Sequence, residues 1–271
     1  MRLLGGGKPS VDRQRRLTYE FPEGLIVCGD SRDMREVPDG SVQLVVTSPP
    51  YNVSKGYVGY HDARPLEEYL DFLDEVWREC YRVLCRGGRI AVNVANTDRT
   101  PYVPLSALIT VRMLKLGFLM RGEIIWDKGP SVGVSTAWGS FARPTNPVLR
   151  DVHEYILVFC KEDWRLPARE EGSGIRNQDF VDWTRSIWQF PTENATRVGH
   201  PAPFPEELPR RLILLYTSRG DTVLDPFLGS GTTAVAAARL GRRFVGYDIS
   251  EEYCALACQR LSAIQGTLWD E

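Results

Sequence analysis

The sequence predicts an α/β fold built on a largely parallel sheet, and two patterns carry this prediction. Short apolar runs typical of strands recur along the chain, and amphipathic helical patterns separate many of them. Such alternation is typical of parallel sheets that helices cover on both faces. The length of 271 residues, with 43% hydrophobic residues, suits one large domain with a modest insertion. The expected strands are Leu25–Cys28, Val42–Thr47, Arg89–Val94, Gly122–Trp126, Tyr155–Phe159, Thr222–Leu224 and Arg243–Tyr247.

Helices are expected between many of these strands. The clearest covers Leu66–Leu84, where apolar residues recur every three or four positions and share one face. Gly87 and Gly88 follow this helix and lead into the next strand. Further helical patterns cover Pro104–Leu116, Pro205–Thr217 and Thr232–Leu240.

Two irregular stretches interrupt the alternation, Asn52–Pro65 and Asp163–Gly199. Long irregular segments inside a compact domain are often functional. We therefore divide the chain into a flexible N-terminal arm over residues 1–20 and one domain over residues 21–271, with residues 163–199 as an insertion.

The composition excludes several classes of protein. The chain has no run of about 18 apolar residues, so we expect no transmembrane helix and no membrane partner. Its first residues are rich in Gly and Arg and lack the apolar stretch of a secretory signal. The six cysteines form no Cys-x-x-Cys pair, so we expect reduced core residues in a cytoplasmic protein and no metal site. A net charge of −2 neither supports nor excludes binding to nucleic acid.

A glycine-rich turn late in the chain indicates a nucleoside site. The apolar run Thr222–Leu224 leads to Asp225, the turn Gly229-Ser230-Gly231 follows, and a helix begins near Thr232. The turn lacks the Lys of a P-loop and the third glycine of a dinucleotide fingerprint. Asp248 ends the next strand, where a carboxylate can bind ribose hydroxyls. S-adenosylmethionine fits, since its own carboxylate can meet the helix N-terminus. A plain glycine turn with a helix cap is the alternative.

The segment Ser48-Pro49-Pro50-Tyr51 directly follows the strand Val42–Thr47. Its two prolines stiffen the chain and remove two N–H donors, so the loop presents mostly acceptors beside an aromatic ring. This suits a base with an exocyclic amine, because hydrogen bonds accepted from its two protons free the nitrogen lone pair for attack on a methyl group. Tyr51 can stack on such a base once it is flipped out of the duplex. Taken alone, a simple turn with a solvent-facing tyrosine is the better interpretation.

Together, the two segments resemble a known family. Thr47–Tyr51 and Asp225–Thr233 are similar to the Ser-Pro-Pro-Tyr catalytic motif and the cofactor motif of DNA amino-methyltransferases. The catalytic motif comes first, which resembles the β-type, circularly permuted members. The resemblance implies a Rossmann-like, S-adenosylmethionine-dependent fold with seven mostly parallel strands, the last inserted antiparallel. Further similar segments are Gly29-Asp30, Arg82–Gly88, Glu123–Lys128, His153–Tyr155 and His200–Pro205.

The resemblance also implies a set of site residues. The catalytic set is Ser48, Pro49, Pro50 and Tyr51. The cofactor-binding set is Asp30, Pro203, Phe204, Asp225, Phe227, Gly229, Ser230, Gly231, Thr232, Thr233 and Asp248. The segment Asp163–Gly199 is the implied target-recognition insertion, with Arg165, Arg169, Arg176, Arg185 and Arg197 as DNA-binding residues. Acidic residues accompany these arginines, so a solvated, partly structural insertion is the rival interpretation.

The residue at the head of the catalytic motif bears on the target base. Family members with Asp in place of Ser48 usually methylate adenine N6, and those with Ser usually methylate cytosine N4. A serine oxygen accepts a hydrogen bond from an amine but is a weak base. No Pro-Cys dipeptide typical of cytosine-C5 enzymes is present. We therefore expect methyl transfer to the N4 amine of a flipped-out cytosine.

The expected protein is thus a site-specific methyltransferase of double-stranded DNA that converts S-adenosylmethionine to S-adenosylhomocysteine. Adenine-N6 methylation by the same chemistry is the alternative. A non-catalytic DNA-binding module, or a methyltransferase of RNA or protein, are the remaining hypotheses. The sequence leaves open a homodimer and a pairing with a restriction endonuclease.

Overall fold

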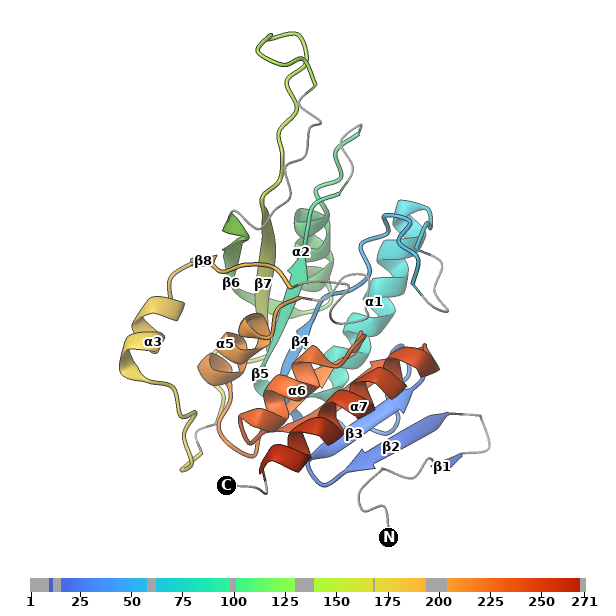
Figure 1. Cartoon of the computed structure of the whole chain (residues 1–271), viewed down its shortest axis with the longest axis vertical. Helices are drawn as coiled ribbons and strands as arrows, with labels where there is room; N and C mark the ends of the chain where they lie inside the picture. Colours follow the sequence, from blue (N-terminus) through green and yellow to red (C-terminus); the bar gives the residue numbers. More distant parts are fainter. Residues whose placement is uncertain are drawn as a thin grey trace.

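A twisted sheet lies at the centre of the molecule, and helices cover both of its faces (Figure 1). The computed structural model describes residues 10–11, 16–57, 62–97, 101–129, 139–167, 169–193 and 204–268. The strands of this part pair in the order β1-β2-β3-β10-β9-β4-β5-β7-β6-β8. Their bounds are β1 Ser10–Val11, β2 Leu17–Phe21, β3 Gly24–Cys28, β4 Val42–Thr47, β5 Leu84–Val94, β6 Phe118–Asp127, β7 His153–Lys161, β8 Ile187–Gln189, β9 Thr222–Asp225 and β10 Arg243–Asp248.

The seven predicted strands are confirmed as one contiguous block, β3-β10-β9-β4-β5-β7-β6. The pairings from β3 to β5 are parallel, whereas β7 is antiparallel to both β5 and β6. The early strand β3 pairs with the late strand β10, as a permuted chain order requires. The short strands β1, β2 and β8 extend the two edges of the block, so the described sheet is larger than the seven strands expected.

The boundary of the predicted N-terminal arm was wrong, because residues 17–20 belong to β2. Apolar and polar residues alternate along this strand, and Tyr19 and Phe21 pack against the core. It pairs antiparallel with β3 from Leu17 to Phe21. Arg16, just before it, forms ion pairs with Asp33 at 3.0 Å and Glu36 at 3.1 Å. Most of the rest of the arm lies outside the described residues.

Two groups of helices cover the two faces of the sheet. On one face lie α1 (Leu66–Val83) and α2 (Leu105–Lys115), and on the other lie α5 (Glu207–Tyr216), α6 (Thr232–Arg239) and α7 (Glu251–Leu268). The short helix α3 (Asn177–Trp183) contacts α5. In the described ranges, no helix has the length and apolar character needed to cross a membrane.

The apolar spacing of α1 produces the expected buried face, since Tyr69, Leu73 and Trp77 are all at most 1% exposed. The helix ends at Val83 and β5 begins at the next residue, so the glycine pair at 87–88 lies inside the strand rather than before it. The predicted helix end is thus confirmed to within one residue, whereas the predicted strand start at Arg89 was wrong. The start of β5 lies at the sheet edge where α1 ends, and the end of β5 lies at the opposite edge.

The insertion after β7 is partly a structural extension of the sheet. Its strand β8 pairs parallel with β6, and Trp183, Trp188 and Phe190 are buried in the core on the α5 side. The guanidinium of Arg211 on α5 lies 5.3 Å from the Trp188 ring and 4.8 Å from the Phe190 ring. These aromatic residues therefore attach the described part of the segment to the sheet, and its role in target recognition stays a prediction.

Candidate active site

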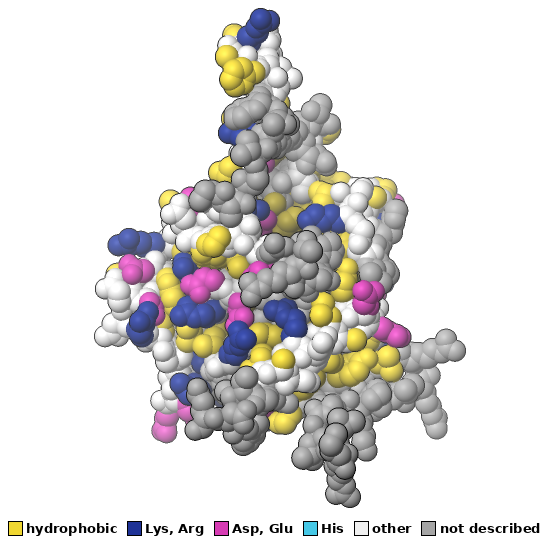
Figure 2. All heavy atoms as spheres, viewed as in Figure 1, with side chains coloured by type: hydrophobic (Ala, Val, Ile, Leu, Met, Phe, Trp, Pro, Cys, Tyr) yellow, Lys and Arg dark blue, Asp and Glu magenta, His cyan; other side chains and the backbone are white. Residues whose placement is uncertain are grey.

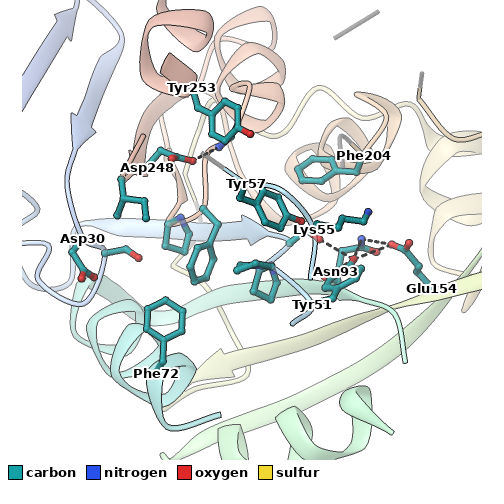
Figure 3. A pocket seen from close by; sticks show the side chains of 18 of the residues that line it. Asp30, Tyr51, Lys55, Tyr57, Phe72, Asn93, Glu154, Phe204, Asp248 and Tyr253 are labelled. Carbon is teal, nitrogen blue, oxygen red and sulfur yellow. Dashed lines mark hydrogen bonds between the residues drawn. The ribbon is translucent and has the colours of Figure 1, made fainter. Parts of the chain in front are cut away.

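A pocket of about 320 Å³ opens at the sheet edge where the parallel strands end. Its lining comes from the loops after β3, β4, β9 and β10, from the ends of β5 and β6, and from the start of β7. Ligands of open α/β sheets bind at this carboxyl edge, near the point where the strand order reverses. Figure 3 shows Asp30 and Asp248 on one side of the pocket and Tyr51, Asn93 and Glu154 on the other.

The segment Ser48–Tyr51 forms the floor between these two sides, and all four of its residues line the pocket. It follows the fully buried strand end at Thr47 and leaves the sheet as a rigid turn because of its two prolines. Tyr69 on α1 donates a 2.7 Å hydrogen bond to the carbonyl oxygen of Pro50. The helix therefore holds the turn from below.

A hydrogen-bonded cluster surrounds the Tyr51 hydroxyl. This hydroxyl lies 2.9 Å from Ser48 Oγ and 3.1 Å from Glu154 Oε2. Asn93 Nδ2 donates to Glu154 Oε2 at 2.6 Å and to the Tyr51 oxygen at 3.1 Å. Lys128 pairs with Glu154 Oε1 at 2.5 Å. Burial, followed by the charge of Glu154, raises the pKa of Tyr51 well above its ordinary value, so the phenol keeps its proton.

Asp225, at the end of β9, is buried and does not line the pocket. Its Oδ1 accepts hydrogen bonds from Thr47 Oγ1 at 2.7 Å and from the Phe227 N–H at 3.1 Å. Its Oδ2 accepts from Thr233 Oγ1 at 2.8 Å. Burial raises the pKa of Asp225 to about 6, although these donors oppose the rise. The carboxylate therefore links the glycine turn and α6 to β4, the strand that precedes Ser48–Tyr51.

Two other acidic side chains face the pocket. Asp248 accepts from the Gly229 N–H and from the Ser250 N–H, each at 2.9 Å, and its second lone pairs remain available for ligand hydroxyls. Burial raises the pKa of Asp248. Asp30 pairs with Arg32 at 2.7 Å. Burial alone would raise the pKa of Asp30, but the hydrogen bonds from Arg32 outweigh it and lower the pKa.

The predicted cofactor residues divide into two groups. Asp30, Phe204, Phe227, Gly229 and Asp248 line the pocket. The others do not line it and instead build the turn beneath it: Asp225, Ser230, Gly231, Thr232 and Thr233. Pro203 lies outside the described residues.

A side chain of α7 binds oxygen atoms of the glycine turn and of the first residue of α6. Arg260 of α7 donates to the Ser230 carbonyl oxygen at 2.6 Å, to Ser230 Oγ at 3.0 Å and to Thr232 Oγ1 at 3.2 Å. At Gly231, which caps α6 with φ of 82°, an added Cβ would lie 2.7 Å from that of Ala257. Close packing between α6 and α7 therefore explains this glycine.

Several residues that line the pocket had no role assigned to them from the sequence. Asn93 and Glu154 contribute to the side around Tyr51, and Phe72 and Tyr253 to the side around Asp30 and Asp248. Lys128 and Trp126 adjoin Glu154, since Lys128 pairs with Glu154 and lies over the Trp126 ring. One signal was available for Asn93, Trp126 and Lys128, because each lies at or just after the carboxyl end of an expected strand. Glu154 had no such signal, because it precedes its expected strand. Phe72 has no such signal, since its spacing on α1 is that of a core residue.

The arginines predicted to bind DNA do not gather at the pocket. The antiparallel strand β7 carries the chain from the carboxyl edge to the amino edge of the sheet, so the insertion begins on the far side. The Arg165 backbone accordingly packs against Gly87 near the start of β5, and Arg169 pairs at 2.8 Å with Asp221, just before β9.

Arg176 lies just before α3, and Arg185 lies just after it. Arg176 pairs with Asp179 at 2.7 Å, and Arg185 lies 4.0 Å from Asp182. Arg197 lies outside the described residues. A DNA-binding role for these five arginines stays a prediction, and the geometry gives it no support for the four that are described.

A family model described as "DNA methylase" matches residues 42–259. This range is most of the chain and contains both the Ser48–Tyr51 segment and the glycine turn after Asp225. The chain belongs to this family. The methylase is thus an amino-methyltransferase of the N6/N4 class, with the permuted order of motifs described above.

Curated relatives agree with this assignment. The Type II methyltransferase M.MjaI of Methanocaldococcus jannaschii is 34% identical, over 83% of the methylase and 87% of its own length. The DNA adenine methyltransferase YhdJ of Escherichia coli is 31% identical, over 87% of the methylase and 82% of its own length.

Solved structures match as well. TTHA0409 of Thermus thermophilus, complexed with S-adenosyl-L-methionine, has a TM-score of 0.70 and 38% identity, and the match covers 87% of the methylase and 91% of that chain. The cytosine-N4-specific PvuII DNA methyltransferase has a TM-score of 0.70 at 22% identity, covering 88% and 86%, and shows the fold alone. The methylase uses S-adenosylmethionine as its methyl donor.

Proposed function

We propose that the methylase transfers a methyl group to the N4 amine of a cytosine that is flipped out of double-stranded DNA. The observation that carries this proposal is Ser48 Oγ at the head of the catalytic segment, hydrogen-bonded to Tyr51 in the lining of the pocket. A neutral hydroxyl there suits an amine that needs only a hydrogen-bond acceptor, whereas a carboxylate occupies this position in most adenine-N6 members of the family.

The pocket fits S-adenosylmethionine on the side that faces β10. Phe72 and Phe227, with ring centroids 6.1 Å apart, offer aromatic surface for a purine, and Asp248 offers acceptors for ribose hydroxyls. Asp30 lies at the same end of the pocket. When bound, the cofactor supplies an electrophilic methyl group on a sulfonium that leaves as a neutral thioether.

The opposite side of the pocket orients the base. Ser48 Oγ and the backbone carbonyl of Pro49 accept hydrogen bonds from the amine, and the Tyr51 ring gives the base an aromatic neighbour. The chain contributes position and acceptors rather than a strong base, because the sulfonium already provides the leaving group. Trp126, buried and stacked on Phe190 at 5.1 Å, supports this side.

The hairpin connection between β6 and β7 is our candidate for the DNA contact. Both strands meet the carboxyl edge here, so residues 139–152 project from the same edge as the pocket, as the yellow-green segment of Figure 1 and the protrusion in Figure 2 show. Phe141 is 72% exposed and Leu149 is 87% exposed, and the exposed Arg143 and Arg150 lie beside them in sequence. Cationic and apolar side chains together suit phosphates and unstacked bases.

Adenine-N6 methylation is the second candidate, and the relative YhdJ, named as a DNA adenine methyltransferase, favours it. The two amines need the same in-line attack, so product analysis decides between them. Duplex DNA is incubated with the methylase and labelled S-adenosylmethionine, digested to nucleosides and analysed by mass spectrometry. N4-methylcytosine is the expected product. A product of N6-methyladenine alone contradicts the proposal, and sequencing of the modified sites gives the recognition sequence.

A further inference from the structure

We propose that Tyr51 and Glu154 fix the direction in which Ser48 forms hydrogen bonds, so that the site accepts an amino-bearing base and rejects its carbonyl-bearing counterpart. Glu154 is a positioning residue in this proposal, because it acts on the base through Tyr51 and Ser48. The inference rests on the proposed function and deepens it, since it names what makes the pocket selective for an amine.

Glu154 can only accept hydrogen bonds. Its side chain is 12% exposed, Lys128 lies against Oε1 at 2.5 Å, and Asn93 Nδ2 lies against Oε2 at 2.6 Å. An ammonium and an amide N–H on its two oxygens both match an ionised carboxylate. The opposite orientation of the Asn93 amide would place its oxygen against that carboxylate, so the orientation described is the favourable one.

The single proton of the Tyr51 hydroxyl is directed by this carboxylate. Its acceptors are Glu154 Oε2 at 3.1 Å and, at 3.4 Å, the backbone oxygen of Asn93. A bond to a carboxylate is stronger than one to a neutral hydroxyl, so the proton points to Glu154 and away from Ser48. The phenol oxygen then accepts from Ser48 Oγ, 2.9 Å away.

The direction of the Ser48 hydroxyl follows from that of Tyr51. A hydroxyl has one proton and two lone pairs, and the proton of Ser48 is already used toward Tyr51. Ser48 therefore turns acceptor lone pairs toward the base. Cytosine N4 and adenine N6 carry N–H donors, whereas uracil and thymine O4 and hypoxanthine O6 are acceptors. A carbonyl at this position meets an acceptor, and both groups lose a hydrogen bond in a confined site.

The test measures binding rather than turnover. Two duplexes are made with the mapped recognition sequence, one with cytosine and one with uracil at the target position, each opposite an abasic site so that neither base is paired. Their Kd values are measured with S-adenosylhomocysteine present. The wild type should prefer cytosine by about tenfold or more. Tyr51→Phe keeps the ring and removes the hydroxyl, so Ser48 is free to donate and the preference should fall below about threefold. Glu154→Gln should also reduce the preference for the cytosine duplex, because the glutamine amide can donate to the Tyr51 oxygen and Tyr51 no longer has to accept from Ser48.

Matched controls separate this effect from general damage. Tyr81→Phe removes the hydroxyl of a tyrosine on α1 whose ring packs against Phe118. Glu68→Gln removes an exposed carboxylate. Both variants should keep the wild-type preference for the cytosine duplex. Affinity for S-adenosylhomocysteine shows that each variant has a formed pocket. Should Tyr51→Phe fail this check, Glu154→Gln carries the test.

Two results overturn the proposal. One is a wild-type protein that binds the cytosine and uracil duplexes equally. The other is a preference that survives unchanged in the variants that still bind S-adenosylhomocysteine. If product analysis instead gives N6-methyladenine, the assignment of cytosine as the target fails, but the inference about Ser48 does not. The same comparison of Kd values is then made with adenine and hypoxanthine at the target position.

Discussion

Thr47 Oγ1 donates a 2.7 Å hydrogen bond to the buried carboxylate of Asp225, a residue 178 positions later in the chain. Thr47 immediately precedes the Ser48–Tyr51 segment, and Asp225 begins the glycine turn. Their strands β4 and β9 are parallel neighbours in the sheet. This contact therefore fixes the Ser48–Tyr51 segment relative to the glycine turn, which we propose to orient the base and to support the cofactor, respectively.

Replacing Thr47 with valine should weaken both the fold and the pocket. Valine keeps the shape but removes the donor, which leaves Asp225 Oδ1 with the Phe227 N–H. Loss of a hydrogen bond to a buried charged group should lower the free energy of unfolding by about 1–3 kcal/mol. Urea denaturation measures this, and calorimetry should show weaker S-adenosylmethionine binding. The control Thr110→Val removes a hydroxyl that is bonded only within α2. Equal stability of Thr47→Val and the wild type would contradict this role.

Asp225 should also give the methylase a pH-dependent stability. Burial raises its pKa to about 6 in the folded protein, whereas an unfolded aspartate titrates near 4. Between these values the unfolded chain loses the proton first, so stability falls as pH rises through this window. The loss should reach about 3 kcal/mol above pH 6.

The variant Asp225→Asn isolates this contribution. It cannot ionise, so its free energy of unfolding relative to the wild type should rise by that amount between about pH 4 and pH 6, and then stay constant. Urea titrations at a series of pH values measure the difference. A difference that does not change with pH would mean that Asp225 is ionised throughout, with an unshifted pKa.

Two pairs of arginines should differ in their effect on DNA binding. Arg143→Ala with Arg150→Ala removes the cations of the hairpin at the carboxyl edge, and duplex affinity should fall about tenfold, with a shallower salt dependence. Arg165→Ala with Arg176→Ala alters the segment that returns from the amino edge and should change neither. Fluorescence anisotropy at several salt concentrations measures both. If the second pair weakens binding and the first does not, the insertion rather than the hairpin contacts DNA.

Asp62 should order the loop that follows the catalytic segment. Its buried carboxylate accepts from the backbone N–H groups of Asn52 at 2.8 Å, Val53 at 3.1 Å and Lys55 at 3.0 Å. Asn52 has a positive φ of 59°, which needs such support. Asp62→Ala should make this loop more sensitive to protease and weaken cofactor binding, because Lys55 lines the pocket. Asp39→Ala, at an exposed ion pair with Arg82, is the control. Unchanged proteolysis would exclude this role.

The parts of the site that the sequence predicts are those carried by contiguous motifs. Ser48–Tyr51 follows a strand directly, so its place at the carboxyl edge follows from local pattern alone. Glu154 could not be found this way, because its position beside Tyr51 depends on the antiparallel register of β7 against β5, where Val94 pairs with Tyr155. Apolar periodicity gives the face of a strand but neither its neighbours nor its direction.

The direction of β7 also explains why the arginine prediction lacks support. A parallel strand would have delivered residues 163–176 to the pocket edge, whereas the antiparallel strand delivers them to the opposite one. Because β7 starts at the carboxyl edge, where β6 ends, the β6–β7 connection lies at the edge that carries the pocket. Its sequence carries no recognised motif. The predicted fold class depends on many strands, so an error in the direction of one strand does not change it.

The order of strands around β9 bears on how the methylase is made in the cell. A ribosome releases β3 and β4 early, but they meet only through β9 and β10, which come from residues 222–248. During synthesis, β3 and β4 therefore cannot join into one sheet until β9 and β10 have been made. A nascent or truncated chain has the residues that would hold the base but lacks Asp248 and the turn beneath the cofactor. We therefore expect that a chain ending before β10 has no methyltransferase activity.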